Sequence, residues 1–490
     1  MADNKELPNG FTGFAFRKQP GTESAADAIR EREAQRAAHA ATPQAAPAPR
    51  RGAASYLTER EAAADAANEV RGAFQYNREH QEAAAAYAAA VEDAEGMKHV
   101  EFDPEKLATI PEKNRRWAWL EIDLNAIRHN AMAVKSMIGA GRHMMAVVKA
   151  DAYGHGAVRV AKTALNSGAD YLGVATVDEG IQLREGLVNA PILMLAEPPE
   201  SAIPLLLAYK IMPAIYSSEF AIKYAEAADS MGLHAPFHLA INTGMNRIGV
   251  HWDQVVTFMH QVGFHRALQL EGTFTHFATA DCAETLDFQI QAKRFIEAVE
   301  ALREAGINPG IVHCANSAAA IRYPDVRFDM VRLGIGLYGY QPCPETMPLI
   351  ELRPAMSVHA RITDTRLVPM SEGVSYGLNY RSPGSVKICT VPVGYGDGLR
   401  RGLSGRTDFL VDGVRCRQVG NICMDQCMFE VDLRSYARRR RVDPQVGDEV
   451  LIVGQQGDAM VTIEEMCDTL NTIPHELCIG FAQRMPRYYV

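Results

Sequence analysis

A lysine at the end of a predicted β-strand is the residue of this sequence best placed to do chemistry. Lys149 follows the apolar run 144–148 and opens the glycine-bearing segment 149–156. A lysine in this place is held rigidly and is partly withdrawn from water, so its amine gives up a proton more easily. Such an amine can form a Schiff base with a carbonyl substrate or with pyridoxal phosphate. The sequence therefore predicts a reactive amine at a pocket.

Eight short apolar runs, separated by segments of helical period, predict the elements that position this lysine. The runs are residues 144–148, 171–176, 191–196, 212–216, 237–241, 271–276, 310–314 and 329–334. Eight strand and helix repeats within about 210 residues are typical of a (β/α)8 TIM barrel rather than of an open doubly wound sheet. Functional side chains of such a barrel gather at the carboxyl ends of its strands.

Polar residues follow several of these runs, and as a set they suit pyridoxal phosphate. They are Lys149 and Tyr153 after the first run, Arg247 after the fifth, His276 after the sixth, Asn316 and Ser317 after the seventh, and Arg332 at the eighth, where Gly334 and Ile335 add main-chain amides. The hydroxyls of Ser317 and Tyr153 and the main-chain amides near Gly334 and Ile335 can bind a phosphate. His276 can lie against the pyridine ring. Each residue taken singly has a structural explanation, whereas the whole set indicates a cofactor site.

Arg332 indicates what the cofactor would do. Many pyridoxal phosphate enzymes place a carboxylate at the ring nitrogen, which keeps the nitrogen protonated and makes the ring a deep electron sink. An arginine donates a hydrogen bond there without transferring its proton. Arg332 therefore disfavours transamination and decarboxylation, and it favours the return of a proton to the carbon that lost it.

Composition divides the chain into three parts. Residues 1–115 are rich in Ala and Pro, which predicts a low-complexity, largely disordered extension with marginal helices within 58–95. Residues 116–350 contain the eight repeats and are expected to form the barrel. Residues 351–490 contain short strands separated by turns such as Val411-Asp412-Gly413, which predicts a mainly β C-terminal domain.

Charge and hydropathy exclude several classes of protein. A net charge of -9 argues against nucleic acid as a partner, and the arginine run 438–441 is interpreted as a solvated loop. No apolar segment approaches the roughly 18 residues of a membrane span, and the chain opens without a signal peptide. None of the nine cysteines forms a C-x-x-C pair or joins a histidine at zinc spacing. We expect a cytoplasmic protein with reduced thiols, without a metal and without a membrane or nucleic-acid partner.

Residues 117–490 resemble the alanine racemase family, the fold type III pyridoxal phosphate enzymes. The similar segments are 119–124, 149–156, 331–339, 374–377, 393–398 and 423–426. The resemblance implies that Lys149 binds the cofactor as a Schiff base, that Arg247 lies near its phenolic oxygen and that Arg332 lies at its ring nitrogen. It further implies Tyr376 as a second catalytic base, Tyr395 as a substrate-entry residue and the Met424 amide as a ligand of the substrate carboxylate.

Racemisation requires a base on each face of a planar carbanion, because a single base would return the proton to the face it came from. The resemblance assigns Lys149 to one face and Tyr376 to the other. In the family this tyrosine comes from the neighbouring subunit, which implies a homodimer with active sites shared across the interface. The expected reaction interconverts L-alanine and D-alanine, the latter for peptidoglycan.

Three positions depart from the family pattern. Ala240 replaces a carbamylated lysine, so Arg247 needs another negative or polar partner, and a chloride or Asn242 is our hypothesis. Gln483 replaces a tyrosine and Asn421 an arginine. Smaller side chains there could open the substrate pocket, which leaves a serine or broad-specificity racemase as an alternative.

Two further alternatives belong to other functional classes. A non-catalytic protein that binds pyridoxal phosphate would not need Tyr376 or a second domain. An amino acid decarboxylase would need an acidic residue at the ring nitrogen, where this chain has Arg332.

Overall fold

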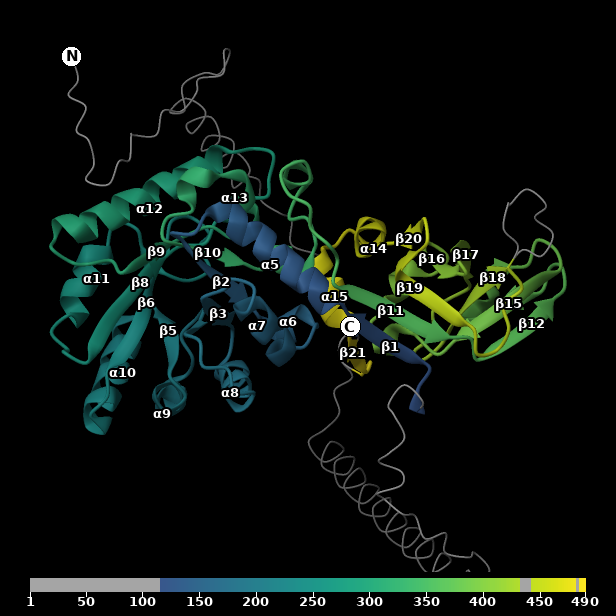
Figure 1. Ribbon diagram of the computed structural model, residues 1–490, viewed down its shortest axis with the longest axis horizontal. Coiled ribbons are helices and arrows are strands. Elements are labelled where there is room, and N and C mark those ends of the chain that lie inside the picture. The colour runs from purple at the N-terminus through teal and green to yellow at the C-terminus, as the bar shows by residue number, and fades with distance from the viewer. Residues whose placement is uncertain (1–114, 432–441, 482–483) are drawn as a thin grey trace, which may run out of the picture. The chain divides into compact units, whose positions relative to one another are not determined.

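The computed structural model describes residues 115–431, 442–481 and 484–490. Figure 1 shows these residues in colour. The predicted extension up to residue 114, the arginine run 438–441 and Gln483 lie outside the described residues.

The eight apolar runs form a parallel barrel. Its strands are β2 (His143–Val147), β3 (Tyr171–Val174), β4 (Ile192–Met194), β5 (Ile211–Ile215), β6 (Ala235–Asn242), β8 (Leu268–Phe274), β9 (Ile311–His313) and β10 (Met330–Leu333). The order is β10-β2-β3-β4-β5-β6-β8-β9, and the short β7 (Val250–His251) pairs with β6. Hydrogen bonds from the Asp329 amide to the Val312 carbonyl (3.0 Å) and from the Arg332 amide to the Ala315 carbonyl (2.9 Å) bring the two ends together. The predicted barrel is confirmed.

Helices follow most of the barrel strands and lie outside them in Figure 1. They are α7 (Ala157–Leu165), α8 (Val177–Glu185), α9 (Ile203–Ala208), α10 (Ser218–Met231), α11 (Val255–Val262), α12 (Leu286–Glu304) and α13 (Ser317–Arg322), and α5 (Leu124–Ile138) precedes β2. Polar residues start several of them. The Ser217 hydroxyl accepts a bond from the Phe220 amide at the start of α10, and Thr176 with Glu179 forms a capping box on α8.

Apolar side chains fill the barrel interior. A buried layer consists of Met145, Leu193, Ala214, Ala240, Phe274 and Met330. These residues come from different strands, since alternate positions of each strand point inward. This layer of the interior is therefore a packed apolar core.

The C-terminal part forms a second, mainly antiparallel sheet. Its order is β12-β15-β18-β17-β16-β19-β11-β1-β21, with β20 (Ala459–Val461) on β19. The strands are β1 (Ala118–Ile122), β11 (Met356–Arg361), β12 (Asp364–Val368), β15 (Val386–Val391), β16 (Asp408–Val411), β17 (Val414–Val419), β18 (Cys427–Val431), β19 (Glu449–Gln456) and β21 (Arg487–Tyr489). Two helices, α14 (Ile463–Leu470) and α15 (Pro474–Phe481), precede β21. The predicted mainly β domain is confirmed.

One strand joins a different sheet from its neighbours in sequence. β1 lies in the segment that we assigned to the barrel, yet it pairs antiparallel with β11 and parallel with β21. Its partners lie far downstream, so no local pattern reveals the pairing. The hairpin between β16 and β17 turns at Asp412 and Gly413, both with positive φ (49° and 75°), at the turn predicted from the sequence.

Three properties of the described residues bear on partners and cofactors. No helix among them is both long and apolar enough to cross a membrane. No group of three or more His, Cys, Asp or Glu side chains in these ranges could hold a metal ion. All nine cysteines fall within them and carry free thiols.

Candidate active site

Lys149 opens an unusual turn at the carboxyl end of β2. The short helix α6 (Lys149–Tyr153) continues with four non-glycine residues, 150–153, whose φ angles lie between 50° and 54°. This is left-handed helical backbone, which costs about 1–2 kcal/mol for each residue with a side chain. The turn therefore needs strong contacts from its surroundings, and Lys149 and Tyr153 stand at its two ends.

The Lys149 amine is half-buried among other charges. Burial lowers its pKa, the Arg247 and Arg332 guanidinium groups lower that pKa further, and Glu179 opposes them. A larger fraction of this amine is therefore neutral than for a lysine in water. A neutral amine is the form that attacks a carbonyl carbon.

Two hydroxyl groups meet the backbone that follows β10. The Ser317 hydroxyl accepts bonds from the amides of Gly334 (3.0 Å) and Gly336 (3.3 Å). A Cβ atom on Gly334 would lie 3.1 Å from the Tyr153 hydroxyl and 3.8 Å from that of Ser317. Burial raises the pKa of Tyr153 to about 12, so its phenol stays a hydrogen-bond donor. Glycine thus leaves room beside two hydroxyls and main-chain amides, a set that suits a phosphate.

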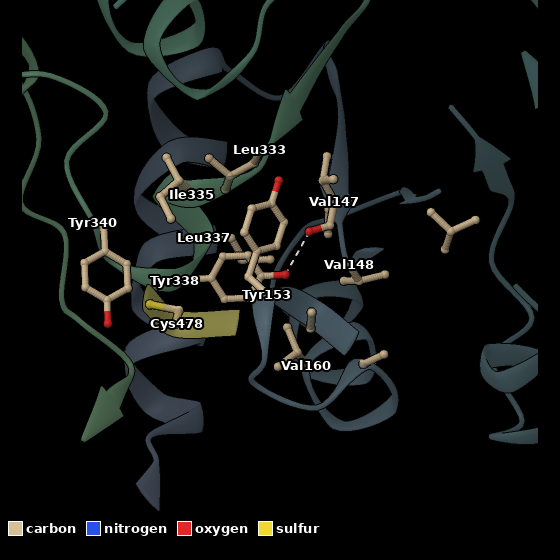
Figure 2. Close-up of a cluster of buried hydrophobic side chains, with 14 of the residues drawn as sticks. Val147, Val148, Tyr153, Val160, Leu333, Ile335, Leu337, Tyr338, Tyr340 and Cys478 are labelled. Carbon is tan, nitrogen blue, oxygen red and sulfur yellow. Dashed lines mark hydrogen bonds between the residues drawn. The ribbon is translucent and has the colours of Figure 1, made fainter. Parts of the chain in front are cut away.

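Packing at the ends of β2 and β10 holds Tyr153 in place. Figure 2 shows its ring beside that of Tyr338, with ring centroids 4.7 Å apart, and Leu333 and Ile335 nearby. The Tyr338 hydroxyl donates to the Val147 carbonyl at 2.8 Å. These contacts tie the turn to the ends of β2 and β10.

Asn316 starts the helix that carries Ser317. Its side-chain oxygen accepts a bond from the Ala319 amide (3.0 Å), which caps α13. Asn316 thereby fixes the place of Ser317 at the end of β9.

Arg332 lies buried, with 3% of its surface exposed. One terminal nitrogen of its guanidinium donates to His313 Nδ1 (3.0 Å), and the other donates to His276 Nδ1 (3.0 Å) and to the Thr275 carbonyl (2.8 Å). Burial lowers the pKa of Arg332 to about 10, so it remains a cation at neutral pH. Because an arginine can only donate, both histidines must accept at Nδ1 and carry their proton on Nε2. His313 Nε2 in turn donates to His238 Nδ1 at 2.9 Å.

The buried histidines of this region stay neutral. Burial lowers the pKa of His238 to about 3 and that of His155 to about 4. Burial together with the nearby Arg332 charge lowers the pKa of His276 and of His313 well below the ordinary value. The hydrogen-bond chain from Arg332 therefore persists at neutral pH.

We expect the free energy of unfolding to fall between pH 7 and pH 5. An unfolded histidine, with a pKa near 6.5, takes up a proton at pH 5, whereas the buried ones do not, so acid favours the unfolded chain. The contribution of these neutral histidines to the free energy of unfolding is fully present above about pH 6.5. It decreases as the pH falls, until the pH reaches the folded-state pKa of about 4 for His155 and about 3 for His238. At pH 5, His155 and His238 should each lower the free energy of unfolding by about 2 kcal/mol.

Urea unfolding at pH 7 and pH 5 measures this loss. His155→Asn should make the free energy of unfolding less dependent on pH. An unfolding free energy that is equal at the two pH values would refute the buried, neutral state of these rings.

Arg247 lies exposed in the loop after β6. The Asn242 side-chain oxygen accepts bonds from the amides of Gly244 and Asn246, both at 3.1 Å. Its amide nitrogen donates to the Asn246 side chain at 3.0 Å. Asn242 thus makes these bonds within its own loop, and its pairing with Arg247 stays a hypothesis. A chloride beside Ala240 remains a hypothesis.

The remaining predicted residues form a second group on the C-terminal sheet. Tyr376, Tyr395 and Met424 are exposed by 74%, 42% and 54%. The Gly396 amide donates to the Met424 carbonyl (2.8 Å), which places Tyr395 and Met424 on adjacent turns. The Asn421 side chain donates to the Tyr376 carbonyl (2.6 Å). Within the described ranges, no hydrogen bond, ion pair or ring contact joins these three residues to Lys149.

Several residues that support the site escaped the sequence reasoning. They are Asp151, His155, Glu179, His238, His313 and Arg487. The Glu179 carboxylate accepts a bond from the Ala150 amide (2.6 Å), and Arg487 pairs with Asp151 (2.7 Å). Glu179, His238 and Arg487 have partners distant in sequence. Asp151 and His155 lie within the segment 149–156 and His313 lies directly before Asn316, so these three carried a local signal.

Comparison with known proteins identifies the relatives of this chain. The profile described as "Alanine racemase, N-terminal domain" matches residues 122–342, and "Alanine racemase, C-terminal domain" matches residues 355–489. The chain belongs to the alanine racemase family. It is 41% identical over 378 residues to the alanine racemase of Synechocystis sp., covering 77% of this chain and all of that protein. The alanine racemase 1 of Bacillus subtilis is 40% identical over 378 residues, with 76% and 93% covered.

A solved structure agrees with these sequence matches. The alanine racemase of Clostridium difficile 630 is 38% identical, with a TM-score of 0.71, and the match covers 76% of this chain and 96% of that one. Alanine racemases depend on pyridoxal 5′-phosphate. The comparisons support an alanine racemase rather than a serine or broad-specificity racemase or a non-catalytic binding protein.

The charges of the site fit this cofactor. The Arg247 and Arg332 guanidinium groups lie close enough to Lys149 to lower its pKa, and the Glu179 carboxylate opposes them. An excess of positive charge beside the hydroxyls of Ser317 and Tyr153 favours a dianionic phosphate. The residues present therefore suit pyridoxal 5′-phosphate.

Proposed function

We propose that this member of the alanine racemase family interconverts L- and D-alanine with two bases, Lys149 and Tyr376. The observation that supports it most is Lys149 itself, a half-buried amine with a lowered pKa, set at a strand end beside Arg332. The amine is available as a base on one side of the substrate carbon. A second base is needed on the other side, because racemisation adds the proton to the face opposite the one that lost it.

The barrel residues hold the cofactor in this proposal. Ser317, Tyr153 and the amides of Gly334 and Ile335 bind its phosphate, and Asn316 supports them. When the cofactor is bound, His276 would lie at its ring, Arg332 would donate to the ring nitrogen and Arg247 would face the phenolic oxygen. When bound, pyridoxal phosphate supplies a conjugated ring that delocalises the electrons of the broken Cα–H bond.

Arg332 limits how far this delocalisation goes. Its guanidinium keeps its proton, and His276 and His313 are neutral acceptors, so no group around Arg332 offers an acidic proton. The negative charge then stays largely at the α-carbon, where Lys149 or Tyr376 returns a proton. The residues thus favour racemisation over transamination.

We also propose a homodimer in which the partner subunit completes each site. Tyr376, Tyr395 and Met424 are exposed in one chain, although the proposed reaction needs Tyr376 next to the substrate. Exposed aromatic and methionine side chains are enriched at protein interfaces. A two-fold interface would supply two equal sites. Tyr395 would then line the entry and the Met424 amide would bind the substrate carboxylate.

The cellular role follows from the reaction. We place the enzyme in the cytoplasm as a source of D-alanine for peptidoglycan, in agreement with the absence of a membrane-spanning helix among the described residues. We assign residues 116–350 to the cofactor-binding part and 351–490 to the β domain that carries Tyr376, with β1 paired in the second sheet.

Chiral chromatography of L-alanine and L-serine reactions, run side by side with pyridoxal phosphate, tests the proposal. We expect racemic alanine to form at least about tenfold faster than racemic serine, since an extra hydroxyl must be desolvated without a matched partner. Equal rates on the two amino acids would contradict the assignment of alanine as the substrate. No turnover despite bound cofactor would contradict the racemase activity itself.

A further inference from the structure

The turn that carries Lys149 receives support from the far end of the chain. Arg487, in β21, pairs through one terminal nitrogen with Asp151 Oδ2 (2.7 Å). Its Nε donates to the Gly154 carbonyl at 2.9 Å. One guanidinium thus bridges a side chain inside the left-handed turn and the carbonyl that follows it. In Figure 1, β21 lies close to α6.

Asp151 links Arg487 to the start of the next helix, α7. Its Oδ1 accepts a bond from the Ala157 amide (2.7 Å), at the start of α7, while its Oδ2 faces Arg487. The side chains of Arg487 and Asp151 are 23% and 35% exposed. Partial burial of a charge-assisted bond makes it stronger than an exposed pair.

The same strand packs against the glycine that ends the turn. A Cβ atom on Gly156 would lie 1.9 Å from the Tyr489 hydroxyl, so a side chain at position 156 would displace the strand. Gly156 also has a φ of 93°, which favours glycine. The strand therefore fits the turn in shape as well as in charge.

The turn itself joins two residues of the proposed cofactor site. Lys149 is its first residue and Tyr153 its last, and the residues between them have left-handed φ angles. If the turn relaxed to ordinary backbone, the Lys149 amine and the Tyr153 hydroxyl would move relative to Ser317 and Gly334. Contacts that hold the turn therefore set the distance between the reactive amine and the phosphate donors.

We propose that Arg487 is a positioning residue, which holds the left-handed turn 150–153 and so fixes Lys149 and Tyr153 for the cofactor. This inference rests on the proposed function for the roles of Lys149 and Tyr153. Arg487 acts through Asp151 and Gly154 and does not touch the substrate.

Arg487→Lys tests this role in the full-length protein. A lysine keeps the charge, but it lacks the planar fork that presents separate nitrogens to Asp151 and to the Gly154 carbonyl. We expect the dissociation constant of pyridoxal phosphate, titrated into the cofactor-free full-length enzyme, to rise about tenfold. Arg159→Ala is the matched control, because Arg159 lies over the Tyr489 ring of the same strand (5.6 Å). It should leave the dissociation constant unchanged.

Hydrogen exchange separates a local role from a general one. In Arg487→Lys, exchange of the amides in peptide 147–157 should speed up by about tenfold, while peptide 192–208, in β4 and α9, should keep its rate. Faster exchange in both peptides would reduce Arg487 to a general stabiliser and overturn the proposal. Unchanged exchange in both would overturn it as well.

A second variant keeps the proposal testable if Arg487→Lys folds poorly. Asp151→Asn removes the charge pair while the amide oxygen can still accept from Ala157. We expect it to raise the cofactor dissociation constant by a similar factor. The cofactor dissociation constant of the double variant should be no higher than that of the weaker-binding single variant, because both substitutions disrupt the same Arg487–Asp151 pair. Additive effects of the two substitutions would contradict the bridge.

Lys149→Ala separates the test of the proposed racemase function from the test of the positioning role of Arg487. Full racemase activity in Lys149→Ala would refute the proposed function, and the exchange measurement would still report on the turn. Loss of activity in Lys149→Ala, together with normal cofactor affinity and exchange in Arg487→Lys, would refute only the positioning role.

Discussion

Lys149→Ala should lower racemisation of alanine by at least about 10⁴-fold and remove the visible absorbance of lysine-bound cofactor. The substitution deletes the amine that joins the cofactor covalently and serves as one base. The pKa of this amine is lowered by burial and by Arg247 and Arg332, which suits both tasks. Chiral chromatography gives the rate, and an absorbance spectrum gives the bound cofactor.

The control for this variant is another lysine near the same turn. Lys162→Ala, on the outer face of α7, should keep the rate and the spectrum, because its side chain is exposed to solvent. A Lys149→Ala enzyme that keeps a rate within tenfold of wild type would show that another amine carries the chemistry.

Tyr376→Phe should lower racemisation by about 10³-fold and leave the cofactor spectrum intact. The variant lacks the base for one face, whereas Lys149 still serves the other. In D₂O we therefore expect exchange of the α-proton to continue with one enantiomer of alanine and to cease with the other. Proton NMR of L- and D-alanine incubated separately measures this. Equal exchange with both enantiomers would disprove the assignment of Tyr376 as the second base.

Mixing the two inactive variants tests whether a site draws its bases from two subunits. A mixed dimer of Lys149→Ala with Tyr376→Phe has one site without either base and one site with both. Random reassociation places half of the chains in mixed dimers, so activity should return to about a quarter of the wild-type value. If Lys149 and Tyr376 of the same chain formed a site, mixing would restore nothing.

Much of the fold was determined by the sequence itself. Each of the eight apolar runs became a barrel strand near its predicted bounds, because parallel strands buried on both faces are mostly apolar. The predicted turn at Asp412 and Gly413 formed for an equally local reason, since only a few residue types adopt positive φ there. The placing of Lys149, Arg247, His276, Ser317 and Arg332 at strand ends follows from the barrel pattern alone.

The tertiary structure decided everything that depends on contacts between distant segments. β1 joins the second sheet because its partners β11 and β21 lie far downstream. The left-handed turn after Lys149 is not a preference of alanine, aspartate or tyrosine, and it persists because Glu179 and Arg487 bind it from outside. The lowered pKa of Lys149 arises from burial and from neighbouring charges, which only the folded chain brings together. A sequence states which side chains exist, and the fold fixes which of them share an environment.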